Sequence, residues 1–234
     1  MNSKINDNGT YPPEHLDLQR MNRVMRHRLR NLCCGMKMAL ERVSEQTRSD
    51  YPNVGDNCIV MVSELENLLN FTTRMDLLFD SLPMPEPLTL FQIISHARQF
   101  FAEKHPFCSL KMIGPEEDLK IIPGTLVRLA LEELLANAGE LTTDEKVELK
   151  WEYGKGLKLM VESAFDEPVD HIPVAPPVPF MTNRGRHDGL GLAIVQRIAD
   201  SIGGSFKFRQ LSDERVITSI RIPARHIEMR QKDS

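Results

Sequence analysis

The chain has 234 residues, which is enough for one large domain or two small ones, and 41% of them are hydrophobic. That content suffices for a buried core. A net charge of −4 and the lack of a long basic cluster argue against nucleic-acid binding.

Two further classes are excluded by the pattern of apolar residues. No apolar run approaches the roughly 20 residues that span a bilayer, and the polar N-terminus lacks the apolar stretch of a signal peptide. The four cysteines, at positions 33, 34, 58 and 108, lack metal-site spacing. The adjacent Cys33 and Cys34 fall in a helical pattern and cannot readily face each other, so reduced thiols are expected. The sequence therefore predicts a cytoplasmic protein without a membrane span.

The first 80 residues predict a helical hairpin after a flexible tail at 1–17. A helix is expected from Leu18 to about Gln46, and a polar stretch from Thr47 to Asn57 interrupts the pattern before a second helix. Apolar residues recur at spacings of three and four in the first helix, as in a bundle seam: Met25, Leu29, Leu32, Met36, Ala39 and Val43. The second helix repeats the same alternation with Met61, Leu65, Leu68, Thr72, Met75 and Phe79. One hairpin cannot bury both seams. We therefore expect a homodimer in which two hairpins, residues 18–80, form a four-helix bundle.

His27 is the candidate nucleophile of this hairpin. It lies off the predicted seam, so its imidazole is expected in solvent, where much of it is unprotonated near neutral pH. Arg26, Arg28 and Arg30 place three cations around it, and Asn31 follows one turn later. Arginines there would attract a phosphoryl donor. The alternative, which the residues alone leave open, is an ordinary solvated charged face.

A Pro-rich linker at 81–88 separates the hairpin from a second domain at 89–223. Helices are expected at Leu90–Glu103, with Phe91, Ile94, Ala97 and Phe101 as its apolar stripe, at Thr125–Ala138, and after Gly189. Strands are expected at 109–112, 119–122, 145–153, 157–161, 205–209 and 215–222, a long loop at 166–188, and a polar tail at 224–234. This order predicts an α+β sandwich, with helices on one face of a mainly antiparallel sheet.

Four blocks in this order resemble the catalytic core of sensor histidine kinases, over residues 18 to 223. The segment His27-Arg28-Leu29-Arg30-Asn31 looks like the H-box of the subgroup in which Arg follows the phospho-accepting His. Glu133-Leu134-Leu135-Ala136-Asn137 looks like the N-box, and Gly189-Leu190-Gly191-Leu192 like the second glycine box. Pro179-Phe180-Met181-Thr182 is similar to the phenylalanine motif of the ATP lid.

The resemblance implies a role for each block. His27 would be the phospho-acceptor, and Asn31 would sit where the family often positions water for the reverse phosphatase reaction. Asn137 would give its amide oxygen to Mg²⁺ bridging the phosphates of ATP, with Glu133 as a polar partner of water or metal. Gly189, Leu190 and Gly191 would give backbone donors to phosphate at a helix start. The phosphoryl group would then pass to an aspartate of a response-regulator receiver domain.

The sequence departs from the family at the first glycine box. Ser163 stands where the adenine-binding Asp is expected, and Phe165 where a glycine lets the base enter. Three functions therefore remain open. The chain could be a histidine kinase core, or an ATP-independent histidine phosphotransferase whose degenerate ATPase-like domain only docks a receiver domain. The third is a non-catalytic scaffold or an anti-sigma-factor-type kinase, against which the seam-patterned helices and the Arg-flanked His27 argue.

Overall fold

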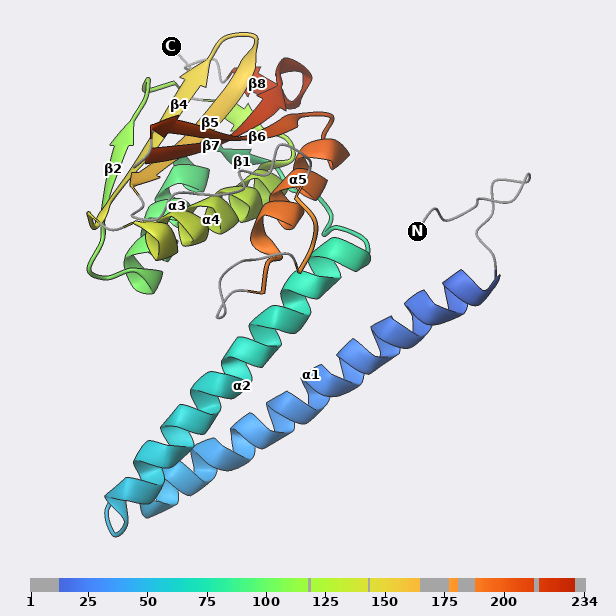
Figure 1. The fold of residues 1–234 in the computed structure, drawn as a ribbon, viewed down its shortest axis with the longest axis vertical. Helices are drawn as coiled ribbons and strands as arrows, with labels where there is room; N and C mark the ends of the chain where they lie inside the picture. The colour runs from blue at the N-terminus through green and yellow to red at the C-terminus, as the bar shows by residue number, and fades with distance from the viewer. Residues whose placement is uncertain are drawn as a thin grey trace. The chain divides into compact units, whose positions relative to one another are not determined.

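The computed structural model describes residues 13–117, 119–142, 144–164, 177–180, 188–212 and 215–229, with side chains from residue 21 onward. The chain divides into two compact units, Met1–Ser81 and Leu82–Ser234. The first is a hairpin of two long helices, α1 (Pro13–Thr47) and α2 (Pro52–Phe79), which pack along each other (Figure 1). Within the described ranges, no helix is long and apolar enough to cross a membrane.

Both helices of the hairpin begin earlier than the periodicity predicts. Helix α1 starts at Pro13 instead of Leu18, and α2 starts at Pro52, inside the stretch expected to be irregular up to Asn57. In each case proline occupies the first position of the helix. Its fixed φ suits that position, and the N–H that it lacks would have had no partner within the helix. Proline here marks a helix start, not an interruption.

The fully buried side chains of α1 and α2, among the residues whose side chains are described, are polar or small. They are Arg26, Cys33, Cys58 and Thr72, and Lys37 pairs with Glu66 farther along. Much of the predicted apolar seam of α1 is instead exposed: Met25, Leu32 and Met36 remain 59%, 60% and 47% exposed, whereas Leu29 is half-buried. A single hairpin thus leaves its most hydrophobic stripe in water.

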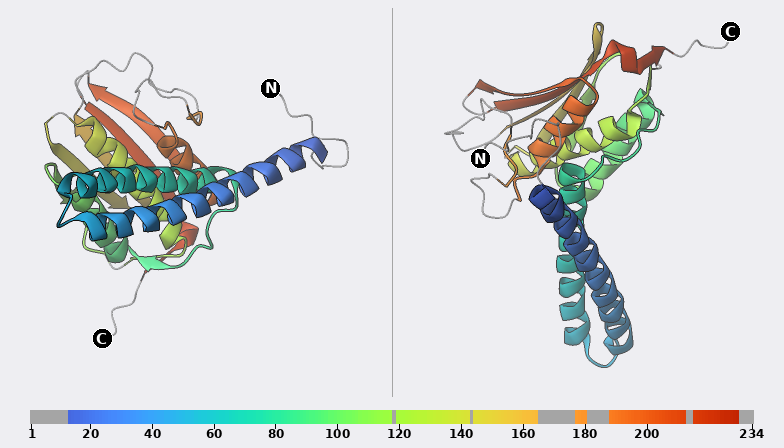
Figure 2. Two further views of the ribbon diagram at one scale, coloured as in Figure 1. Left: turned by 90° about the horizontal axis from the view of Figure 1, so that it is seen from below. Right: turned by 90° about the vertical axis from the view of Figure 1, so that its right-hand side faces the viewer.

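The second unit is a two-layer sandwich. Its main sheet has the strand order β2-β4-β5-β7-β6. The strands are β2 (Ser109–Ile113), β4 (Lys146–Tyr153), β5 (Gly156–Ala164), β6 (Ser205–Ser212) and β7 (Arg215–Pro223). Only the β2–β4 pair in this sheet is parallel. Helices α3 (Leu90–Lys104), α4 (Gly124–Leu141) and α5 (Gly191–Ser201) cover one face (Figure 2). The predicted hairpin and α+β sandwich are confirmed.

The core lies between these helices and the sheet. Alternate residues of β5 and β7 point into it, including Leu157, Leu159 and Ile220, each fully buried, and α4 adds Leu131 and Leu135. Each large apolar side chain removed from water in this way contributes about 1.5–3 kcal/mol to the transfer free energy. The core therefore fixes the height of α4 and α5 above the sheet, and with them the residues of the predicted nucleotide site.

Two sequence predictions for this unit are wrong. Phe91 is 78% exposed, because Leu90, Ile93, Ile94, Ala97 and Phe101 form the buried stripe of α3, which leaves position 91 about one-quarter turn away. The expected polar tail contains strand β8 (Ile227–Met229), which pairs with β3 (Leu119–Ile121); β3 also pairs with β1 (Leu88–Thr89) in a small second sheet. Most of the predicted loop 166–188 lies outside the described residues.

Candidate functional site

His27 lies on α1 with its side chain exposed, as the pattern predicts. Asn31 lies on the same helical face, and its Nδ2 is 3.4 Å from Nδ1 of His27. Three free cations around the imidazole were expected, but two of them are engaged elsewhere. Arg26 and Arg30 both reach across to Asp76 of α2. The reason is rotational: position 26 is turned about 100° from position 27 and faces the second helix.

Five charged side chains join α1 to α2 in what we call the Arg–Asp ladder: Arg23, Asp80, Arg26, Asp76 and Arg30. Arg26 is at its centre and only 6% exposed. Its Nε donates to Asp76 Oδ1 at 2.7 Å and its Nη2 to Asp80 Oδ2 at 2.8 Å. Arg30 donates to the other oxygen of Asp76 at 2.5 Å, and Arg23 to the other oxygen of Asp80 at 3.2 Å. Each carboxylate therefore binds two guanidinium groups.

The ladder shifts the pKa values of Asp76 and Arg26. Burial alone would raise the pKa of Asp76, but the hydrogen bonds from Arg30 and Arg26 outweigh it and hold that pKa below its ordinary value. Burial opposes the charge of Arg26 too, yet its bonds to Asp76 and Asp80 raise its pKa. Both shifts favour the ionised forms of Asp76 and Arg26. Asp76 and Asp80 were missed in the sequence, although their spacing of four on the second helix matches Arg26 and Arg30 on the first.

The N-box residues Glu133 and Asn137 occupy α4 one turn apart and are both half-buried. Nδ2 of Asn137 is buried and has no hydrogen-bond partner among the described residues. An orphaned buried amide is costly unless a ligand or water satisfies it, and an Asn amide offers both an oxygen and a nitrogen. The position of Asn137 is therefore compatible with a bound polar group such as magnesium phosphate.

The neighbouring acids of α4 have bonds of their own. Glu132 is largely buried and accepts a hydrogen bond from Arg128 at 2.7 Å, and burial raises its pKa. Glu140 pairs with Lys104 of α3 at 2.9 Å. This places Glu140 in the contact between α3 and α4.

The glycine turn starts α5. Gly189 has φ +67°, a left-handed conformation that favours glycine, and its carbonyl accepts a hydrogen bond from the amide of Phe180 at 3.2 Å. Leu190 is fully buried, and its amide donates to Oδ1 of Asp188 at 3.0 Å. That amide is thus already bonded, which leaves Gly191 and the following residues as candidate phosphate donors. Among the described residues, no side chain caps the first turn of α5.

The candidate adenine end of the site contains hydroxyl groups. Ser163, on β5, is 2% exposed, and Thr218, diagonal to it on β7, is 8% exposed. Thr218 donates a hydrogen bond of 3.4 Å to the carbonyl of Val161. Sequence reasoning missed Thr218, because one threonine in an alternating strand gives no signal. Phe165, Met181 and Thr182 lie outside the described residues.

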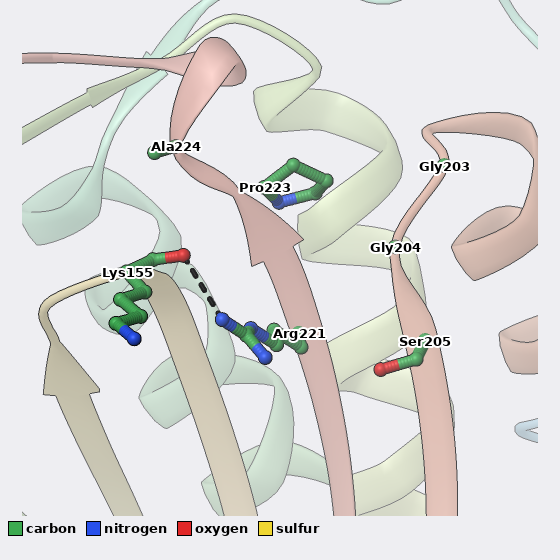
Figure 3. Close-up of a pocket in the computed structure, with 7 residues that line it drawn as sticks. All are labelled: Lys155, Gly203, Gly204, Ser205, Arg221, Pro223 and Ala224. Carbon is green, nitrogen blue, oxygen red and sulfur yellow. Dashed lines mark hydrogen bonds between the residues drawn. The ribbon is translucent and has the colours of Figure 1, made fainter.

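A shallow polar pocket of about 260 Å³ lies at the other end of β5 (Figure 3). Lys155, Ser205 and Arg221 line it, and Arg221 donates to the carbonyl of Lys155 at 3.1 Å. The register places Gly156 opposite Pro223 and Ser163 opposite Val216, so seven residues of strand separate the pocket from Ser163. It is therefore distinct from the predicted nucleotide site. In the described part of the chain, no group of three or more His, Cys, Asp or Glu could hold a metal ion.

Comparison with known proteins finds similar solved structures but no match by sequence. No protein-family model and no curated protein matches the sequence. Among solved structures, the chain is similar to full-length ShkA in complex with AMPPNP, with a TM-score of 0.68 and 17% identity over 91% of this chain and 47% of that one. It therefore spans about half the length of ShkA.

Two histidine kinases give further likenesses. Histidine kinase AdeS of Acinetobacter baumannii has a TM-score of 0.55 and 15% identity, over 80% of this chain and 94% of that one. The catalytic domain of histidine kinase ThkA has a TM-score of 0.53 and 22% identity, over 60% of this chain and 96% of that one. The fold is that of a histidine-kinase catalytic core.

Proposed function

We propose that this chain is the core of a two-component histidine kinase, which accepts the γ-phosphoryl group of ATP on His27 and passes it to an aspartate of a response-regulator receiver domain. The observation that carries the proposal is an exposed imidazole on the hairpin of a histidine-kinase fold, one turn from Asn31 and beside the Arg–Asp ladder. In our proposal residues 18–80 form the phosphotransfer hairpin and 89–223 the nucleotide domain.

The nucleotide domain supplies the groups that such a transfer needs. Asn137 would bind Mg²⁺ through its amide oxygen, with Glu133 one turn earlier as partner of water or metal, and the amides from Gly191 onward would bind phosphate. Bound magnesium supplies charge neutralisation to the transferred group, and the protein mainly positions the reactants. Two observations support a phosphate ligand here: the orphaned Nδ2 of Asn137, which could donate to a phosphate oxygen, and the first turn of α5, which no described side chain caps. AMPPNP, an ATP analogue, binds ShkA, which has the same fold.

We propose further that the hairpin dimerises. The exposed stripe of Met25, Leu32 and Met36 is the surface that a second copy would cover, since the α1–α2 interface leaves it in solvent. Two hairpins would complete a four-helix bundle with an apolar centre. His27 would remain accessible on the outside.

The second candidate is an ATP-independent phosphotransferase. It is favoured by Ser163, a buried hydroxyl where the family binds adenine with a carboxylate. A hydroxyl accepts a hydrogen bond from an amino group more weakly than a carboxylate does. In this function the phosphoryl group would reach His27 from a phosphorylated receiver domain, and the second unit would only dock that domain.

One labelling experiment separates these functions. Purified protein is incubated with γ-labelled ATP and Mg²⁺, beside the His27→Gln variant. Acid-labile label in the wild type and none in the variant supports the kinase. If ATP gives no label but a labelled receiver domain does, and His27→Gln again stays unlabelled, the phosphotransferase is correct. No His27-dependent label from either donor contradicts both.

A further inference from the structure

The Arg–Asp ladder runs along the flank of His27. Arg23 precedes His27 by four residues and Arg30 follows it by three, so both are neighbours of His27 on the helix surface, with Cβ atoms about 5–6 Å away. Both lie on the side of His27 that faces α2, whereas Asn31 lies on the other side. His27 is thus bordered on α1 by two arginines whose guanidinium groups are bonded to aspartates of α2.

The two arginines beside His27 differ in how firmly their side chains are held. Arg23 is 65% exposed and bonds Asp80 at 3.2 Å, whereas the Arg30 side chain is 33% exposed and bonds Asp76 at 2.5 Å. Asp76 itself is fixed by the buried Arg26. Arg30 is therefore the cation beside His27 whose position is determined by the interior of the hairpin.

Arg30 retains capacity for a second anion. A guanidinium has five N–H donors, and the hydrogen bond to Asp76 uses one of them. Arginine suits phosphate because two parallel donors match two oxygens.

We propose that Asp76 is a positioning residue, which holds Arg30 beside His27 so that Arg30 binds the phosphoryl group during transfer. This rests on the function proposed for His27. In the transfer, an imidazole nitrogen forms a bond to phosphorus, the bond from phosphorus to the donor's leaving atom breaks, and the ring loses a proton to water. Arg30 neutralises charge on the phosphoryl oxygens throughout, and Asp76 does not touch the reacting atoms.

The test uses phosphoramidate, a small donor that needs neither a nucleotide site nor a receiver domain. Its phosphorus–nitrogen bond breaks, the phosphoryl group moves to His27, and ammonia leaves with the balancing proton. The full chain is treated with phosphoramidate, and the rate of phosphohistidine formation is measured by phosphorus NMR. The variants are Asp76→Asn, Asp76→Glu, Arg30→Ala and the double variant Asp76→Asn with Arg30→Ala. Asp56→Asn, an exposed aspartate of α2, and Arg42→Ala, an exposed arginine of α1, are the matched controls.

We expect Asp76→Asn and Arg30→Ala each to slow the formation of phosphohistidine by about three- to tenfold. This effect is larger than that of losing an exposed ion pair and smaller than that of losing a buried hydrogen bond to a charged group. The double variant should be no slower than Arg30→Ala, because Asp76 acts through Arg30. Asp76→Glu should recover most of the rate, and the controls should match the wild type. Helix content by circular dichroism checks folding. Arg30→Ala leaves both bonds of Arg26 in place, so it tests the phosphoryl contact even where Asp76→Asn unfolds.

Four outcomes contradict parts of this scheme in different ways. Wild-type rates in a folded Asp76→Asn protein overturn the proposal, as does a double variant whose losses multiply. A wild-type rate in Arg30→Ala would show that Arg30 does not contact the phosphoryl group during transfer. If the wild type takes up no phosphoryl group on His27, whereas free histidine does under the same conditions, the proposed function itself fails.

Discussion

Gly139 packs so closely against His105 that Gly139→Ala should destabilise the protein, although a change from glycine to alanine within a helix usually stabilises it. Gly139 lies in α4, where alanine would normally gain about 1 kcal/mol over glycine in helix propensity. A Cβ added there would lie 2.5 Å from Cδ2, 2.6 Å from Cγ and 2.7 Å from Nε2 of His105. The His105 ring cannot readily move away, since it packs against Phe101 with ring centroids 5.2 Å apart. Overpacking of this kind costs about 1–3 kcal/mol.

The two effects together predict that Gly139→Ala destabilises the second unit by about 1 kcal/mol, which lowers Tm by roughly 2–4 °C. In a His105→Ala background the clash is gone, and the same substitution should stabilise by about 1 kcal/mol. The difference is a coupling of about 2 kcal/mol.

The chain has one tryptophan, Trp151 of β4, so its fluorescence during urea unfolding follows the second unit alone. Gly35→Ala in α1 is the matched control, because a Cβ there meets nothing within 4 Å; it should stabilise the hairpin, measured by circular dichroism. If Gly139→Ala is equally stabilising with and without His105, the steric argument is refuted.

Further predictions concern the second unit, with Trp151 fluorescence as the readout. Burial and the charge of Lys104 lower the pKa of His105 from its ordinary 6.5, so the unfolded chain takes up a proton first. Stability should therefore fall as pH drops below about 6.5 and level off below the folded pKa, and His105→Phe should abolish that contribution to the slope. Leu134→Ala, at a position 1% exposed, should cost about 2–5 kcal/mol. Thr89→Ala removes the capping box of α3 and should cost about 1 kcal/mol; a loss below the error of the urea fit would contradict it.

Periodicity was enough to predict the hairpin and the sandwich, because burial repeats along helices and strands. It failed where the rotational phase was ambiguous, as at Phe91, which lies next to the buried Leu90. It failed also at β8, a strand of three residues with Glu228 at its centre, too short for any alternation to be visible. Proline at position 52 was misread because the same residue either starts or stops a helix.

The residues of the candidate site could be proposed from their order in the sequence, but their bonds could not. Which arginines surround His27 depends on the rotation of α1 against α2, and that is set by the pairing of Arg26 with Asp76, 50 residues later in the chain. Likewise, the amide of Leu190 is bonded by Asp188 because of the left-handed turn at Gly189. These are long-range or conformational facts, and local sequence patterns do not encode them.

If the hairpin dimerises as we propose, its folding is coupled to protein concentration, because ionic residues lie between α1 and α2 while Met25, Leu32 and Met36 lie outside. In that dimer the second copy would cover Met25, Leu32 and Met36 and so add hydrophobic stabilisation that one hairpin alone lacks. Unfolding then obeys mass action, and each tenfold dilution lowers the apparent stability by about 1.4 kcal/mol. The abundance of the protein in its host would set how much of the hairpin is assembled, and therefore how much of His27 is presented on an ordered helix.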